Sequence, residues 1–169
     1  MTLIGGLPAH PLIVHAVVVL LPLAAVGTLA IAARPTWRRN LGVPVFLIAL
    51  VGVLAVPVAT KTGDQLKDVL GGDDRLIEIH EARADRLLPF AVGFLVLLVA
   101  ALLLGRRADR AARAGRTHRA EAAATARLQS HVSIAVAVLA ALAGLLVAGL
   151  VVWIGDAGAT SVWQHVVSS

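Results

Sequence analysis

The sequence predicts an all-α integral membrane protein, a four-transmembrane-helix up-down bundle with both termini on the outer side of the membrane. Two observations predict this class: the composition is strongly apolar, and long uncharged stretches recur along the chain. Of the 169 residues, 59% are hydrophobic and 15% are charged, and the mean hydropathy is +0.87. A water-soluble domain carries about 25% charged residues, which excludes a soluble globular fold. We expect one membrane domain over residues 1–169.

Four windows contain no charged residue: 1–33, 40–60, 87–105 and 128–155. Each is about as long as the roughly 20 residues that cross a bilayer as a helix. We place the spans near 12–33, 41–60, 87–104 and 133–154, with the third helix starting near residue 74. A cleaved signal peptide is the alternative for the first window, but its arginines follow the apolar stretch instead of preceding it.

The charges between the spans predict the orientation. The turn 34–40, "RPTWRRN", has three arginines and no acid, and the loop 105–127 has seven arginines against Asp109 and Glu121. The positive-inside rule makes both segments cytoplasmic, in a bacterial inner (cytoplasmic) membrane. The net charge of +5 then serves topology and contact with anionic lipid headgroups. No nucleic-acid partner is expected, since the basic loop lacks interleaved aromatic residues.

Small residues and prolines predict how the spans pack. The fourth span carries a small-residue seam that lets a neighbouring helix approach closely; its members are Ala137, Ala140, Ala141, Gly144 and Ala148. We favour internal packing for this seam, with a homo-oligomer face as the alternative. Prolines in three spans predict either an outer cavity or plain helix curvature; these are Pro22, Pro57 and Pro89. No internal repeat is evident.

Histidines gather toward the outer side, where His10, His15 and His80 stand near the ends of the first and third spans. His118 and His131 lie toward the cytoplasmic side. The helical rise of about 1.5 Å per residue places His10 level with His80, and His15 level with Asp85. Since the first and third spans are diagonal in a sequentially wound bundle, both pairs are expected to point across its interior.

Two opposed histidines at one height are typical of a b-type haem with two axial imidazoles. His80 is the first predicted ligand, with His10 as its partner and His15 as the reserve. Ala84 leaves space on the same helical face as His80. Basic side chains are predicted to reach the haem propionates; these are Lys61, Arg83 and Arg86. If His10 is the ligand, Asp85 is expected to orient His15.

Two alternatives stay open for the same residues. Three histidines with Asp64, Glu81 and Asp85 nearby also suit a zinc or copper site. The polar groups are otherwise structural, at the ends of helices in a cofactor-free, partner-binding membrane protein. No catalytic triad, phosphate-binding loop or dinucleotide fingerprint occurs, so a hydrolase or a kinase is not expected.

Several segments resemble the bacterial membrane family called domain of unknown function 2231: "GLPAHPLIVHAVVVLLPLAA", "RPTWRR", "ATKTGDQL", "IHEARADRLLP" and "GDAGATSVW". The family has no assigned activity, and its distant similarity to four-helix membrane cytochromes b implies haem binding. The positions that match the family are His10, Pro11, His15, Gly63, His80, Asp85, Gly155 and Gly158. The cytoplasmic side lacks a second histidine pair, so at most one haem is expected. The function predicted is electron transfer, as a carrier or as a subunit of a larger redox complex, rather than turnover by a stand-alone enzyme.

Cysteine labelling tests the predicted orientation, because the chain has no cysteine of its own. In intact cells, a membrane-impermeant maleimide should label Gly72→Cys from outside and should label Gly115→Cys only after the membrane is permeabilised. The reverse pattern would move the histidines to the cytoplasmic side.

Overall fold

The computed structural model describes residues 2–70, 75–114 and 120–167. The elements are β1 (Leu3–Ile4), β2 (Leu7–Pro8), α1 (Ala9–Ala33), the 3-10 turn η1 (Pro35–Trp37), α2 (Arg38–Leu70), α3 (Arg75–Ala84), α4 (Leu87–Ala114) and α5 (Ala120–Val167). Gly72, Gly115 and His118 lie outside the described residues.

Four of these segments are long and apolar enough to cross a membrane, which confirms the predicted all-α class with four spans; the side on which the termini lie stays a prediction. The predicted spans lie within α1, α2, α4 and α5. Side chains that face away from the bundle are as apolar as those inside; Leu54, Val96 and Val152 are 59%, 61% and 71% exposed. Such a surface suits lipid and would be unfavourable in water.

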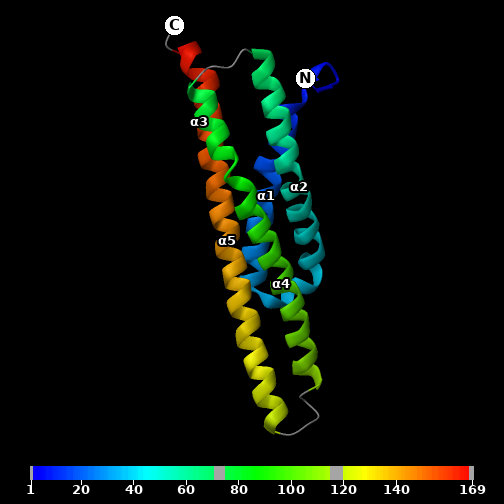
Figure 1. The fold of residues 1–169 in the computed structure, drawn as a ribbon. Helices are drawn as coiled ribbons and strands as arrows, with labels where there is room; N and C mark the ends of the chain where they lie inside the picture. The colour runs from blue at the N-terminus through cyan, green and yellow to red at the C-terminus, as the bar shows by residue number, and fades with distance from the viewer. Residues whose placement is uncertain (1, 71–74, 115–119, 168–169) are drawn as a thin grey trace.

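The helices form a bundle in which α1 packs against α2 and α5, and α4 packs against the same two helices. The first and third spans are therefore diagonal, as expected. Helix α1 begins and α5 ends at one end of the bundle, called here the termini end (Figure 1). At the opposite, loop end, α4 and α5 extend beyond α1 and α2 (Figure 1), so most of the predicted loop 105–127 is helical.

The third span differs from the prediction of one helix starting near residue 74, because the chain breaks at Asp85–Arg86 between α3 and α4. Pro89 explains the break. A proline lacks the N–H that would bond to the carbonyl four residues earlier, and its ring clashes with that carbonyl. The carbonyl four residues before Pro89 belongs to Asp85.

Short elements close the termini end. Strands β1 and β2 form an antiparallel hairpin whose turn residues Gly5 and Gly6 have φ of +58° and +84°. Two successive positive φ angles are typical of the type I′ turn that joins such strands. The hairpin is tied to α2, because the Thr2 backbone N–H and hydroxyl both donate to Gln65 Oε1.

At the loop end, a partly buried ion pair joins the start of α2 to α4. Arg38 is 6% exposed, and its Nη2 donates to Asp109 Oδ1 over 3.0 Å. A Cβ at position 105 would overlap the Arg38 guanidinium, so any side chain larger than that of Gly105 would force this group to move. One arginine of the basic turn thus serves helix packing.

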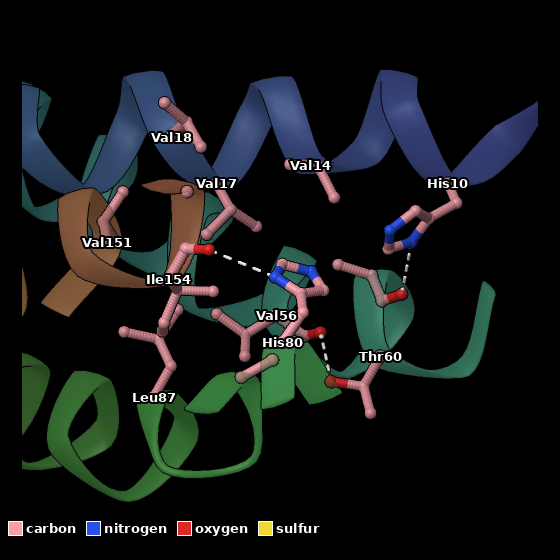
Figure 2. A pocket seen from close by; sticks show the side chains of 13 residues that line it. His10, Val14, Val17, Val18, Val56, Thr60, His80, Leu87, Val151 and Ile154 are labelled. Atoms are coloured by element: carbon pink, nitrogen blue, oxygen red, sulfur yellow. Dashed lines mark hydrogen bonds between the residues drawn. The ribbon is translucent and has the colours of Figure 1, made fainter. Parts of the chain in front are cut away.

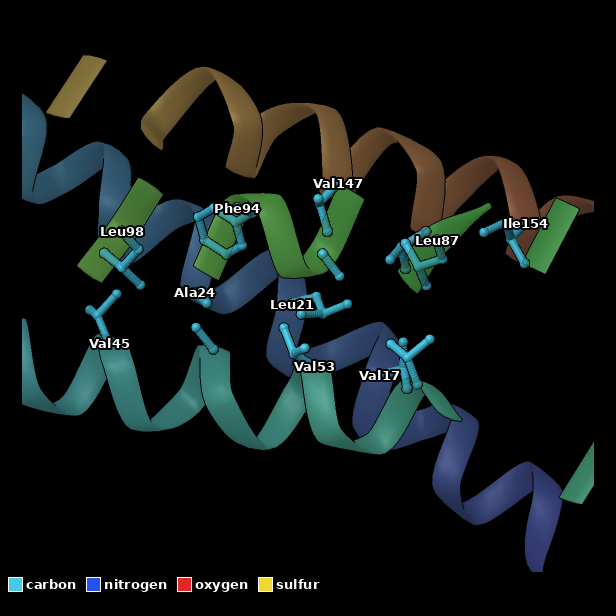
Figure 3. Close-up of a cluster of buried hydrophobic side chains, with 14 of the residues drawn as sticks. Val17, Leu21, Ala24, Val45, Val53, Leu87, Phe94, Leu98, Val147 and Ile154 are labelled. Carbon is cyan, nitrogen blue, oxygen red and sulfur yellow. The ribbon is translucent and has the colours of Figure 1, made fainter. Parts of the chain in front are cut away.

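The core follows the bundle axis, and its largest fully buried side chains are Leu21, Phe94, Leu98 and Val147 (Figure 3). The predicted seam is part of it: Ala137, Ala140, Ala141 and Gly144 are buried. A Cβ on Gly144 would lie 2.9 Å from Phe94 Cε2 and 3.2 Å from the Ala25 Cβ. The seam therefore packs α5 against α1 and α4, which confirms the interpretation as internal packing.

Replacing Gly144 by valine should destabilise the bundle by about 1–3 kcal/mol, the usual cost of overpacking, as measured by unfolding in detergent. Gly149→Val on the same helix is the control, because nothing lies within 4 Å of a Cβ at that position. Equal stability of the two variants would contradict this packing.

Candidate functional site

His10 lies in the first turn of α1, one residue before Pro11, and faces α2. Its Nδ1 lies 2.9 Å from the Ala59 carbonyl oxygen, and the ring is partly buried. A carbonyl oxygen only accepts hydrogen bonds. The imidazole therefore carries its proton on Nδ1, and in the neutral ring the lone pair stands on Nε2.

His80 lies in the middle of α3 and faces α5. Its Nδ1 lies 3.1 Å from the Ile154 carbonyl oxygen, and this ring is also partly buried. The same reasoning gives the same tautomer, with the lone pair on Nε2. A histidine ligand to a metal is commonly held in this way, with the other ring N–H donated to a carbonyl or carboxylate.

Each imidazole also lies directly against a glycine. A Cβ at Gly63 would be 3.0 Å from His10 Cε1, and a Cβ at Gly158 would be 3.0 Å from His80 Cε1. Both distances are shorter than ordinary carbon–carbon contact. Any larger residue at either position would displace the ring.

The two imidazoles meet at a cavity of about 70 Å³ near the termini end. Its other walls are mainly aliphatic, with Val14, Val17, Val56, Leu87, Val151 and Ile154 among them. Figure 2 shows the Nε2 side of His10 turned toward that of His80 across this space. In the described part of the chain, neither Nε2 has a hydrogen-bond partner. The predicted pairing of His10 with His80 by height is thus realised at one site.

The second predicted pair, His15 with Asp85, is not formed. The His15 side chain is exposed and its Nδ1 bonds to the Pro11 carbonyl oxygen one turn earlier in α1. Asp85 is exposed at the break between α3 and α4. His10, and not His15, lies on the cavity wall.

The predicted basic side chains lie outside the cavity wall. The Arg83 guanidinium stacks 4.4 Å from the centre of the Trp153 ring, and its Nη1 donates to the Trp153 carbonyl oxygen over 3.3 Å. Arg86 and Lys61 are exposed. Arg83 therefore joins α3 to α5.

The acidic residues are also used elsewhere. Lys67 Nζ bonds to Glu81 Oε2 over 2.6 Å, which ties α2 to α3, and Asp64 is exposed. Among the described residues, no group of three or more histidine, cysteine, aspartate or glutamate side chains is arranged to hold a metal ion. The expected cluster of three histidines with carboxylates is not brought together.

Sequence reasoning missed what holds the imidazoles. The carbonyls of Ala59 and Ile154 carry no signal in the sequence, because every residue type supplies the same group. The glycines four residues later, Gly63 and Gly158, are visible in the sequence as matches to the family resemblance, and the structure now gives them a physical role.

No curated protein and no solved structure was found to match the chain. A family described as "Predicted membrane protein (DUF2231)" matches residues 6–169, which include both histidines, both glycines and all four spans. The chain belongs to this family of membrane proteins.

Proposed function

We propose that this membrane protein binds one redox-active metal centre between His10 and His80 and transfers electrons, as a small carrier or as a subunit of a larger redox complex. The observation that carries the proposal is the pair of opposed imidazoles. Each ring donates its Nδ1–H to a backbone carbonyl, and both line the same cavity. This leaves the two Nε2 lone pairs facing the same cavity, an arrangement that supports binding of a metal ion.

Two imidazoles are a complete protein donor set for only some metal centres. Structural zinc takes four protein ligands, and catalytic zinc takes three; the described residues offer no such group. Haem iron needs only two axial ligands from the protein, and imidazole also suits copper. The number of donors thus favours haem iron or a copper ion over zinc.

The volume of the cavity distinguishes between haem and a copper ion as candidates. Sites for organic cofactors usually enclose about 300–1,000 Å³, whereas the whole cavity that the two imidazoles line is about 70 Å³. A porphyrin would require the valine side chains to move apart, whereas a single ion would not. The size of the cavity therefore supports copper as the metal we propose, and b-type haem is the alternative that the opposed imidazoles favour.

Metal analysis of the full-length protein tests the proposal. Protein purified in detergent from copper- and haem-replete cells should contain one copper per chain and give no Soret band. His10→Ala and His80→Ala should each weaken copper binding by more than the roughly 10–100-fold that loss of a group supporting a ligand costs. His15→Ala and His131→Ala are the controls and should bind copper like the wild type, since neither residue lines the cavity.

Other results are equally informative. A Soret band that sharpens and shifts on dithionite reduction would replace copper by haem between the same two histidines. A colourless, metal-free wild-type protein would refute both copper and haem binding, and would leave a cofactor-free, partner-binding function. Loss of metal in the His131 variant would show that the centre lies elsewhere.

A further inference from the structure

The bundle consists of two helical hairpins, α1–α2 and α3/α4–α5, which both run from the termini end to the loop end and back (Figure 1). Each histidine bonds within its own hairpin: His10 to Ala59 over 2.9 Å, and His80 to Ile154 over 3.1 Å. His80 follows His10 by 70 positions, and Ile154 follows Ala59 by 95. The second offset is larger than the first because the second hairpin has more residues between its histidine and the carbonyl to which that histidine bonds.

The two glycines are separated by the same 95 positions as Ala59 and Ile154, since Gly158 follows Gly63 by 95. A Cβ at Gly63 would lie 3.3 Å from His10 Nδ1 and 3.8 Å from its Nε2. The distances from a Cβ at Gly158 to the same atoms of His80 are 3.1 Å and 3.7 Å. The contacts of the two imidazoles thus agree to within about 0.2 Å.

The buried positions repeat with the same offsets. On the first helices of the hairpins, buried residues pair at an offset of 70 as Val17/Leu87, Leu21/Ala91, Ala24/Phe94, Thr28/Leu98 and Ile31/Ala101. On the second helices, they pair at an offset of 95 as Val45/Ala140, Ala49/Gly144, Gly52/Val147, Val56/Val151 and Thr62/Ala157.

The cavity wall is itself paired. Every lining residue except Val18 has its counterpart, at one of these two offsets, on the same wall. Val14 thus corresponds to Ala84, and Thr60 to Gly155. The cavity is therefore lined by corresponding positions of the two hairpins, as sites between repeats commonly are in membrane proteins.

We propose that the protein is an internally duplicated helical hairpin, in which each hairpin carries one half-site: a histidine, the carbonyl that accepts its Nδ1–H, and a glycine four residues after that carbonyl. The two half-sites face each other across a pseudo-twofold axis. Gly63 and Gly158 are positioning residues, and a ligand between them meets two equivalent donors. The metal on this axis rests on the proposed function, whereas the duplication and the positioning of the imidazoles do not.

The spacing of carbonyl and glycine has a physical reason. In an α-helix, a carbonyl oxygen accepts the N–H of the residue four positions later, and its second lone pair can accept from another donor; at Ala59 the imidazole shares it with the Thr62 hydroxyl, which donates over 3.0 Å. The side chain of that later residue stands beside the oxygen and limits the approach. A glycine there lets an imidazole from the neighbouring helix reach the second lone pair.

Nitrogen NMR of the metal-free, full-length protein with ¹⁵N-labelled histidine tests the half-sites without depending on any metal. At a pH where imidazoles are neutral, His10 and His80 should both show the Nδ1–H tautomer. Gly63→Ala should shift only the His10 resonances, and Gly158→Ala only those of His80. Gly93→Ala and Gly149→Ala are the matched controls, with nothing within 4 Å of the added Cβ.

An Nε2–H tautomer at either histidine in the wild type would overturn the proposal, even if a glycine variant failed to fold. So would resonances that move in one hairpin and not in its counterpart, or a Gly63→Ala variant that shifts His80. If metal is bound, each alanine variant should also weaken its binding, by a similar factor in both hairpins. NMR shifts as expected in a protein that binds no metal would refute the proposed function and leave the duplication standing.

Discussion

Close approach between helix backbones is the constraint on which the rest of the structure depends. Lipid chains are as apolar as leucine, so burial of apolar surface does not drive the helices together. Association then relies on contact at short range, and small residues provide it. Gly144 lies against Phe94 and Ala25, and Gly52 against Leu21. At these positions even one added methyl group meets a neighbouring helix.

Glycines that allow close approach also position the two candidate ligands. Gly63 and Gly158 allow α2 and α5 to approach His10 and His80 so closely that each imidazole reaches a backbone carbonyl. The tautomer of both rings follows from that contact, since the carbonyls only accept. The same contacts, between His10 and Gly63 and between His80 and Gly158, therefore determine both how closely the helices pack and how the imidazoles are oriented.

The sequence was sufficient for the features that depend on position along a helix axis. Uncharged windows located the spans, and the helical rise correctly set His10 level with His80. The reasoning from the sequence failed for features that depend on the direction in which a side chain points around the helix axis. His15 follows His10 by five residues, which turns it by about 140° around the helix, so it cannot share the cavity-facing side. Asp85, five residues after His80, is displaced in the same way, and Pro89 breaks the helix there.

The duplication is not visible in the sequence, because corresponding positions of the two hairpins carry side chains of different size. In the first hairpin, the large residue Leu21 lies against Gly52. Their counterparts are the small Ala91 and the larger Val147, so size has moved from one helix to the other. Ala24 and Ala49 correspond to Phe94 and Gly144, so here too the sizes of corresponding residues differ between the hairpins. Packing requires hydrophobic side chains of suitable volume rather than particular residues, and the hydropathy is too uniform along the helices to reveal the repeat.

Equivalent donors do not make the surroundings of the site equivalent. The second hairpin adds the Arg83–Trp153 stack and supplies Glu81 to the ion pair with Lys67 of the first, yet all four side chains lie off the cavity wall. Among the described residues, that wall carries no acidic side chain, and its only ionisable groups are the two imidazoles. If the proposed metal ion were held there, it would receive no compensating negative charge from this wall, and each added unit of charge is costly in apolar surroundings. Under the proposed function, the wall would therefore favour the lower oxidation state of the metal, which for copper is the monovalent ion.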